Sequence, residues 1–419
     1  MAKRGATYSA FYKVKPIRIM SIKYFLLIIL FTFQFISCSA QSSEKLLDRS
    51  LTKIYKESNF PGFAISIIRG DSTLFSKSYG YADKAKKLPY TLETIQPVAS
   101  VSKTFIALAL VKSNELGYFN LETNINDILP FRIINPNFPN DIITIKHLAT
   151  HTSALIDNEA VYYNEAYQLS TRPTIELGVF LKDYYTKEGR FYSSKNFDST
   201  NAGKNYSYSN IASALMAYII EVKAKMPFSE FTAKYIFQPL KMTHTGWFYD
   251  EQYASSYATL YQVNQTESPL EEKILNNDKS LKIYSCVTYP DGSLKTSAYD
   301  LTLFLRAMMK GYFTNDSIII GNRSFKTLFE KQFTDSNMPT NMDKKEPNRA
   351  IFWAYTRKGD IRHTGSDPGV FAFISFNPFT KFGRVMTLNA SLEGGDNQKT
   401  VGYFMKVIAA LDEFEESVK

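Results

Sequence analysis

One helix constrains the fold of this chain more than any other segment. Residues 105–111 are seven consecutive apolar residues, and the helical segment continues to about Gly117. A helix that is apolar on every side has to lie inside a domain, surrounded by other elements. Residues 94–99, which precede it, have the pattern of a strand and a turn. We therefore expect a buried helix whose N-terminus follows directly from a strand.

A serine and a lysine stand one turn apart at the start of this helix. Ser100 and Lys103 are spaced i and i+3, which places both side chains on one helix face. A desolvated lysine loses its charge readily and can accept the proton of the serine hydroxyl. Free backbone N–H groups at the helix N-terminus would stabilise an oxyanion. The sequence therefore predicts an acyl-enzyme nucleophile at Ser100, whereas the same spacing at residues 42–45 and 50–53 lacks this context.

A second pattern, Tyr208 and Asn210, can supply a proton relay and a hydrogen-bonding clamp. The two residues lie in a polar turn before an apolar helix, from which side chains can project into a cleft. The Tyr208 phenol can shuttle protons if cationic neighbours lower its pKa, and the Asn210 amide can hold Lys103 and a substrate carbonyl. The alternative is a simple helix cap at this position. The bare pattern also occurs at residues 118–120 and 162–164.

A third pattern ends one expected strand and precedes another. It consists of His363, Thr364 and Gly365. A strand beside the cleft would offer backbone N–H groups to a substrate, and Gly365 would permit a close approach because it has no side chain. The second copy, residues 244–246, follows a helix and a loop and has no flanking strand pattern. We interpret the remaining histidines as structural: His147, His151 and His244.

Taken in order, the three motifs resemble those of the serine β-lactamase-related superfamily. The subgroup is that of class C β-lactamases, serine DD-peptidases, D-aminopeptidases and related esterases. Further segments typical of this family lie at residues 80–83, 145–153, 239–242 and 292–301. The likeness covers roughly residues 45–412. It implies a β-lactamase/transpeptidase-like α/β fold, in which helices flank an antiparallel sheet and a mainly helical region is inserted.

The resemblance also implies roles for the site residues. Ser100 would be the nucleophile, Lys103 its base partner, Tyr208 the proton relay and Asn210 the clamp. The substrate would lie along His363, Thr364 and Gly365, with the oxyanion held by the backbone N–H groups of Ser100 and Ser366. His363 stands where many members carry lysine, and histidine is mostly neutral at pH 7 unless its pKa is shifted. This departure favours peptidase-like or esterase-like chemistry over efficient β-lactam hydrolysis.

The pattern of elements agrees with one domain made from both ends of the chain. A hairpin is expected at residues 61–79, and later strands at residues 351–356, 360–364, 370–377 and 384–389. Helices are expected at residues 41–59, 175–185, 211–225, 228–237, 298–310 and 400–415, whereas residues 250–282 have no readable pattern. We expect a single domain over residues 41–419. Its α/β part would span about 45–120 and 285–419, its helical insert about 120–285, and a cleft between them would hold Ser100.

The formal charge of +9 comes mainly from the N-terminus. Residues 1–40 contain six lysines and arginines and no acid, which leaves 43 basic against 40 acidic residues in the rest. The chain has no basic stripe, and its aromatic residues are spread along its length. Nucleic-acid binding therefore has no support.

Residues 1–40 have the pattern of an export signal, with Met20 as an alternative start. The apolar run at residues 25–36 is too short to span a bilayer comfortably and is followed by small residues. Cleavage after Ala40 would release a soluble protein, and cleavage before Cys38 would leave a lipidated cysteine; both outcomes are open. We expect a periplasmic or secreted protein, attached to a membrane only through the signal or a lipid anchor.

No metal or cofactor is expected, because the four histidines are scattered and neither an HExxH motif nor paired cysteines are present. After processing, Cys286 would be the only free cysteine. We predict an exported serine hydrolase that forms an acyl-enzyme on an ester or amide, with weak β-lactamase activity compatible with the motifs. The rival is a penicillin-binding sensor or cell-wall-binding protein that is acylated without turnover. The sequence points to no particular oligomeric state.

Overall fold

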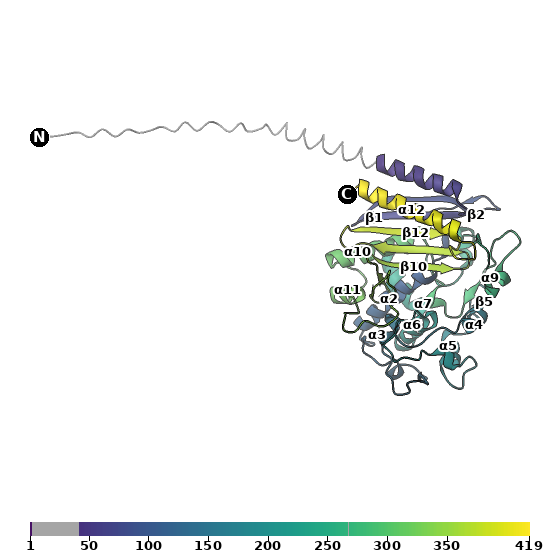
Figure 1. The fold of residues 1–419 in the computed structure, drawn as a ribbon, viewed down its shortest axis with the longest axis vertical. Helices are drawn as coiled ribbons and strands as arrows, with labels where there is room; N and C mark the ends of the chain where they lie inside the picture. Colours follow the sequence, from purple (N-terminus) through teal and green to yellow (C-terminus); the bar gives the residue numbers. More distant parts are fainter. Residues whose placement is uncertain (2–41, 267) are drawn as a thin grey trace. The chain divides into compact units, whose positions relative to one another are not determined.

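The computed structural model describes Met1, residues 42–266 and residues 268–419 (Figure 1). Residues 52–408 form one compact unit, which contains the strands and all predicted catalytic and substrate-binding residues. A second unit is formed by the two ends of the chain, and its residues 42–51 and 409–417 are helical. The predicted export signal, including Met20 and Cys38, lies outside the described residues and stays a prediction.

An antiparallel sheet of eight strands is built from both ends of the chain, which confirms the predicted fold class. Its strand order is β3-β2-β1-β12-β11-β10-β9-β8. β1 pairs with β12 from Phe63 opposite Leu388 to Arg69 opposite Phe382. The strands are β1 (Gly62–Arg69), β2 (Ser72–Asp83), β3 (Leu88–Pro89), β8 (Asn348–Arg349), β9 (Ala354–Tyr355), β10 (Ile361–Asp367), β11 (Val370–Phe376) and β12 (Phe382–Leu388).

The central strands have continuous rather than alternating apolar sequences. All seven residues of β11 are buried, as are seven of the eight in β1. A strand that is covered on both faces requires apolar side chains at successive positions. One cover is α10 (Ala298–Thr314), which packs against β1, β11 and β12.

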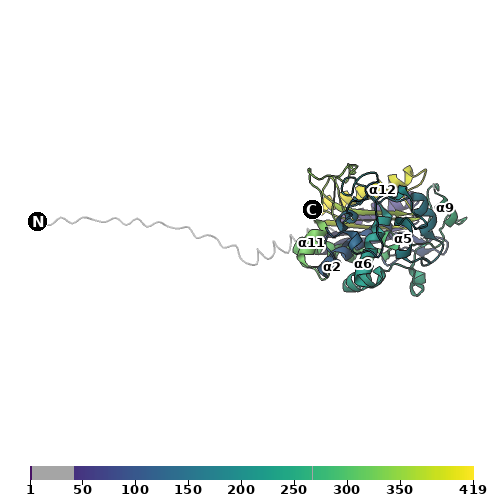
Figure 2. The ribbon, with the colours of Figure 1, turned by 90° about the horizontal axis from the view of Figure 1, so that it is seen from below.

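The helix expected around residues 105–111 is α2 (Lys103–Glu115). Every residue from Lys103 to Val111 is buried, which explains why the sequence shows no polar face. α2 contacts α6 (Asn210–Ala224), and the two helices lie on the same side of the sheet in Figures 1 and 2. The other helices are α3 (Ile145–Ala149), α4 (Glu159–Val161), α5 (Leu177–Tyr185), α7 (Phe228–Thr232), α8 (Gln238–Leu240), α9 (Pro269–Ile274), α11 (Asn322–Phe329) and α12 (Gln398–Ser417).

The region predicted as a helical insert contains α6, several shorter helices and long loops in its described residues. β5 (Tyr167–Gln168) pairs with β6 (Ser285–Cys286) in a separate small sheet. The expected strand at residues 351–356 is wrong at four of its six positions. Phe352 adopts a φ of +52°, which ends the extended backbone, so that only Ala354 and Tyr355 pair as β9 in a hairpin with β8.

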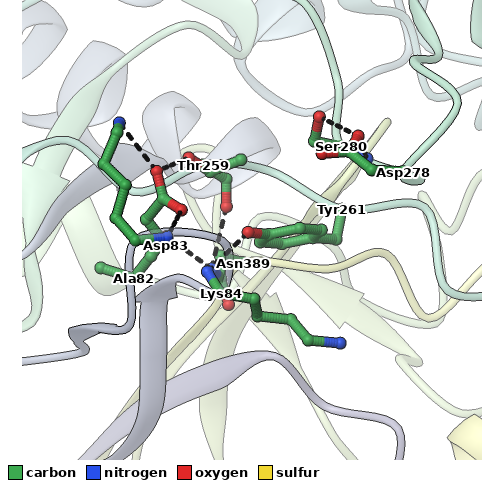
Figure 3. Close-up of polar contacts among 9 residues, drawn as sticks. Ala82, Asp83, Lys84, Thr259, Tyr261, Asp278, Ser280 and Asn389 are labelled. Atoms are coloured by element: carbon green, nitrogen blue, oxygen red, sulfur yellow. Dashed lines mark hydrogen bonds and ion pairs between the residues drawn. The ribbon is translucent and has the colours of Figure 1, made fainter.

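Residues 250–282, whose sequence has no readable pattern, are fastened to the ends of two strands (Figure 3). Asn389 follows β12 and donates from Nδ2 to the carbonyl oxygens of Tyr81, Ala82 and Thr259. Thr259 Oγ1 donates to Asp83 at 3.1 Å, and the Tyr261 hydroxyl accepts from the backbone N–H of Lys84 at 2.8 Å. These bonds tie the loop to the ends of β2 and β12.

The same loop supports the turn between β10 and β11. Gly369 lies in this turn with a φ of +69°. A Cβ atom there would lie 2.6 Å from Leu281 Cδ1 and 2.8 Å from Leu260 Cβ. The close approach requires glycine and positions the C-terminal end of β10, which borders the candidate site.

Candidate active site

Ser100 lies in a tight turn that leads directly into α2. A 3-10 turn, η1 (Ala99–Ser102), precedes the helix, and Ala99 has a φ of +46°. A left-handed conformation at a non-glycine residue costs about 1–3 kcal/mol and persists only where the surroundings enforce it. Here it places Ser100 at the N-terminus of a helix whose first residues are buried.

Lys103 is fully buried and its ammonium group contacts three neutral acceptors. Nζ donates to Ser100 Oγ at 3.1 Å, Asn210 Oδ1 at 2.7 Å and the carbonyl oxygen of Asp291 at 2.8 Å. The predicted nucleophile, its base partner and the clamp are therefore joined by direct hydrogen bonds. This is the distance at which a base can take a proton from a hydroxyl.

Tyr208 contacts Lys103 through its ring. Lys103 Nζ lies 4.9 Å from the ring centroid, a cation–π arrangement. The His151 ring stacks on the ring of Tyr208, with 4.4 Å between the two ring centroids. Among the described residues, the Tyr208 hydroxyl has no hydrogen bond to Ser100 or Lys103, and the side chain is 38% exposed. The hydroxyl is thus accessible to a substrate.

Asp157 positions Asn210 and was not found from the sequence. Its carboxylate accepts hydrogen bonds from Ser209 Oγ at 2.6 Å and from the backbone N–H groups of Asn210 and Ile211 at 2.7 and 3.0 Å. A carboxylate at a helix N-terminus satisfies free N–H groups and the helix dipole. Burial raises the pKa of Asp157 and outweighs the hydrogen bonds, which act in the opposite direction.

His151, interpreted from the sequence as structural, supports the same turn. Its Nδ1 accepts from the backbone N–H of Ser209 at 3.2 Å while its ring holds Tyr208. Burial, and the positive charge of Lys103, keep the pKa of His151 well below its ordinary value. The ring therefore stays neutral and can continue to accept this bond. His151 thus has a structural role, as interpreted from the sequence, and the segment that it holds is the turn of Tyr208 and Ser209.

Strand β10 approaches the nucleophile as closely as the sequence suggested. It pairs with β11 along its whole length but with β9 only at Ile361 and Arg362. The edge of β10 beyond Arg362 therefore has no strand partner, and β10 contacts η1 instead. A Cβ atom on Gly365 would lie 2.2 Å from the carbonyl oxygen of Val98 and 2.9 Å from the backbone nitrogen of Ser100. Only glycine fits between the strand and the nucleophile turn.

His363 is a neutral side chain in this setting. Burial, reinforced by the charge of Lys103, lowers its pKa to about 3. Nδ1 lies 2.7 Å from the carbonyl oxygen of Thr364. Because a carbonyl only accepts, Nδ1 carries the proton and Nε2 is left as an acceptor. His363 therefore cannot supply the positive charge that a lysine would supply at this position.

The predicted residues border one cavity of about 390 Å³. It is lined by Ser100, Tyr208, Asn210, His363, Thr364 and Ser366. Lys103 and Gly365 lie buried behind this lining. The structure thus brings together all eight predicted catalytic and substrate-binding residues, and the decoy patterns at residues 118–120 and 244–246 do not border the cavity.

The sequence model of the Beta-lactamase family matches residues 47–402. The chain belongs to the Beta-lactamase family. Its predicted superfamily and its fold class are thereby confirmed. Over 360 residues it is 23% identical to Protein flp of Staphylococcus aureus (strain N315), covering 85% of this chain and 64% of flp. The chain thus spans less than two thirds of the length of this relative.

Solved structures of this family share the fold. EstCE1, a hydrolase with promiscuous acyltransferase activity, superposes with a TM-score of 0.68 at 18% identity, covering 89% of this chain and 99% of EstCE1. A β-lactamase/D-alanine carboxypeptidase from Yersinia pestis superposes with a TM-score of 0.66 at 17% identity, covering 91% and 99% of the two chains. Both likenesses concern the fold.

Several charged residues that line the cavity of this chain were not identified from the sequence. Arg349 and Arg362 share the carboxylate of Glu346, at 2.8 and 2.9 Å. Asp291, Asp367 and Glu393 line another part of the cavity. These residues come from separate segments and belong to no local motif, so only their proximity to Ser100 identifies them.

Within residues 42–266 and 268–419, no group of three or more His, Cys, Asp or Glu side chains is arranged to hold a metal ion. No helix in that same part of the chain is long and apolar enough to cross a bilayer. Cys286 is a buried free thiol whose sulfur lies 3.1 Å from Thr288 Oγ1.

Proposed function

We propose that this chain is an exported serine hydrolase that forms an acyl-enzyme at Ser100 on an ester or amide substrate. The observation that carries the proposal is the set of hydrogen bonds made by Lys103 Nζ to Ser100 Oγ, Asn210 Oδ1 and the Asp291 carbonyl. A buried amine with no carboxylate partner, held against a hydroxyl, is suited to proton exchange with that hydroxyl.

The reaction would proceed in two steps. Ser100 Oγ attacks the substrate carbonyl, and its proton passes through the Lys103 amine to Tyr208. The oxyanion is held by the backbone N–H groups of Ser100 and Ser366, and the leaving group departs with the proton from Tyr208. Water then attacks the acyl-enzyme, gives one proton to the same network and releases the acid product with Ser100 restored.

Two guanidinium groups, rather than His363, would attract a substrate carboxylate. His363 is neutral because its pKa is lowered to about 3, mainly by burial. Arg349 and Arg362 line the same cavity and share a single carboxylate, Glu346. Asp343 also borders the cavity, so the guanidinium groups themselves, rather than a net positive charge, would pair with the carboxylate of peptidase-like substrates. The two superposed structures are described as a hydrolase with promiscuous acyltransferase activity and a β-lactamase/D-alanine carboxypeptidase, which is compatible with an ester or an amide substrate.

The test is covalent labelling at Ser100. A fluorophosphonate should add once to the wild-type protein, as seen by intact-protein mass spectrometry, and should not add to Ser100→Ala. The labelled enzyme should lose its turnover of p-nitrophenyl acetate, nitrocefin, D-amino-acid anilides or a D-Ala-D-Ala peptide, whichever the unlabelled enzyme cleaves. An adduct that survives Ser100→Ala would place the nucleophile elsewhere.

One observation favours the alternative of an acylated sensor. The Tyr208 hydroxyl has no hydrogen bond to Ser100 or Lys103 among the described residues. Without substrate, Tyr208 is therefore not connected to the nucleophile by a hydrogen bond that could carry a proton. If the bound substrate does not complete this connection, hydrolysis of the acyl-enzyme would be slow. A burst of acylation by a fluorescent penicillin, without later release, would favour the sensor.

The proposal of export rests on residues 1–40. A charged segment, a short apolar run and small residues end at Ala40, and Cys38 offers a site for lipidation. Palmitate labelling and globomycin-sensitive processing would support an anchored form. A mature N-terminus at Gln41 would exclude lipidation at Cys38.

A further inference from the structure

The two ends of the cavity differ in charge, and Ser100 lies between them. β10 runs along the cavity, and from His363 to Asp367 it extends about 13 Å at the rise of an antiparallel strand. At the His363 end, Arg349 and Arg362 contact Glu346. At the other end, the carboxylates of Asp291, Asp367 and Glu393 line the cavity, and none of them forms an ion pair with a lysine or arginine of the described residues.

Asp367 is held in a fixed orientation by two tyrosines. Tyr167, in β5, donates to Oδ1 at 2.8 Å, and Tyr284 donates to Oδ2 at 2.8 Å. A carboxylate has about four acceptor positions, so each oxygen keeps one for a further donor. The rings of Tyr163, Tyr167 and Tyr284 follow one another with centroids 6.0 and 5.8 Å apart. In Figure 1, β5 and α4 lie on the same side of the molecule.

Asp291 has a buried carboxylate oxygen without a hydrogen bond of normal geometry among the described residues, although the Thr288 side chain lies near enough to lower the pKa of the carboxylate. The residue is only 2% exposed, and Tyr162 donates to its Oδ1 at 3.2 Å. Its Oδ2 is buried without a hydrogen-bond partner among the described residues, although the side chain borders the cavity. A buried carboxylate oxygen without a donor is costly, and a ligand that brings a donor removes this cost.

The nearest lysines form no ion pair with these carboxylates in the described part of the chain, although the charge of Lys103 acts to lower the pKa of Asp291 against the effect of burial. Lys103 donates to the backbone oxygen of Asp291, and Lys295 donates to the backbone oxygens of Trp247 and Ser293. Burial raises the pKa of Asp291 to about 6 and that of Asp367 to about 7, and the two charges oppose each other. A cation placed between them would favour the ionised form of both.

We propose that this end of the cavity is a subsite for an ammonium group on the acyl part of the substrate, bound by Asp367, Asp291 and the faces of the neighbouring tyrosines. The inference rests on the proposed function, since it assumes that Ser100 is acylated. Carboxylates with ordered tyrosine rings around them are suited to a desolvated cation. The substrate class is then an aminoacyl ester or amide with a free amine.

The orientation of the substrate follows from Tyr208. This residue stacks on His151, whose ring also contacts that of Tyr206, and Arg349 lies 4.6 Å from the ring centroid of Tyr206. Tyr208 therefore belongs to the arginine end of the cavity. Because Tyr208 would protonate the leaving group, the leaving group faces the arginines and the acyl part extends toward Asp367.

The experiment compares two esters that differ only in an ammonium group. p-Nitrophenyl 6-aminohexanoate and p-nitrophenyl heptanoate have acyl chains of equal length, one ending in an ammonium and the other in a methyl group. After division by the rate of alkaline hydrolysis of each ester, kcat/KM of the wild-type enzyme should favour the amino ester by a factor on the order of ten, the effect of one partly buried ion pair. A ratio of one or below overturns the proposal.

Two variants of cavity carboxylates locate the effect. Asp367→Asn removes one charge without changing size, and the preference should fall to about one because kcat/KM falls more for the amino ester than for the heptanoate ester. Asp343→Asn removes a carboxylate that borders the same cavity near the arginines, and the preference should persist. If only Asp343→Asn abolishes the preference for the amino ester, the ammonium group binds near the arginines rather than near Asp367, and the proposal is overturned.

Failure of the subsite and failure of the proposed function give different results. If neither ester is hydrolysed and no fluorophosphonate adduct forms, the proposed function fails. If both esters acylate Ser100 equally fast, only the subsite fails. Should Asp367→Asn not fold, n-pentylammonium decides the question in the wild-type protein, where it should compete with the heptanoate ester whereas n-pentanol at equal concentration should not. Equal inhibition by the two compounds would overturn the proposal.

Discussion

Gly365→Ala should inactivate the enzyme through a displacement that the structure defines. The added Cβ would lie 2.2 Å from the carbonyl oxygen of Val98 and 2.9 Å from Ser100 N. Since a carbon–oxygen contact needs about 3.3 Å, β10 and the nucleophile turn have to separate by about 1 Å. A misplacement of this size costs about 10² in rate. We therefore expect kcat/KM to fall at least about 100-fold, with a loss of about 1–3 kcal/mol in the free energy of unfolding from overpacking.

The second His-Thr-Gly copy provides a matched control. A Cβ atom on Gly246 would meet no atom within 4 Å. Gly246→Ala should therefore keep both activity and stability. The measurements are kcat/KM for p-nitrophenyl acetate, the rate of phosphonylation of Ser100, and urea unfolding, so that loss of folding is separated from loss of alignment. Wild-type kinetics in Gly365→Ala, or equal losses in the two variants, would refute the assignment of β10 to the site.

Three further predictions concern the groups around the nucleophile. Lys103→Ala and Tyr208→Phe should each lower kcat/KM by about 10²–10⁴, and the double variant should be little worse than the more damaged single one because the two groups act as a unit; multiplying losses would show independent roles. Asp157→Asn should lower the free energy of unfolding by about 1–3 kcal/mol, because an amide cannot accept all three hydrogen bonds at the start of α6; unchanged urea midpoints would remove it from this role. Because the pKa of His363 is lowered to about 3, lowering the pH from 8 to 5 should not strengthen binding of carboxylate substrates through its protonation; a fall of KM in this range that is lost in His363→Gln would contradict this.

The parts of the fold that were predictable are those with local signals. The apolar run at residues 105–111 identified α2, because burial on all sides removes the polar face. The strand patterns at both ends of the chain identified a sheet made from both ends, and β1 does pair with β12. The hairpin of β8 and β9 was not predictable, because Phe352 takes a left-handed conformation that its residue type disfavours. Residues 258–261 are held by backbone and side-chain hydrogen bonds to distant strands, which leave no periodicity in the sequence.

The candidate site was predictable where spacing carries chemistry. Ser100 and Lys103 are adjacent because of helix geometry, and Gly365 is required by a close approach that a strand end suggests. Asp157 gave no signal, because its three partners lie more than fifty residues away in the chain. The same holds for Asp367, whose partners Tyr167 and Tyr284 are 200 and 83 residues distant.

Residues that were predictable from local spacing and residues brought together only by the fold have different chemical roles. Residues joined by local spacing perform the step that every acyl-enzyme needs, which is proton transfer at a serine beside an oxyanion site. Residues joined only by the fold, Arg349 and Arg362 at one end of the cavity and Asp291 and Asp367 at the other, surround the parts of the substrate that differ between hydrolases. A neutral His363 contributes no charge between them. Selectivity in this chain should therefore change with substitutions at the two ends of the cavity, while substitutions at Ser100, Lys103 or Tyr208 should lower the rate for all substrates alike.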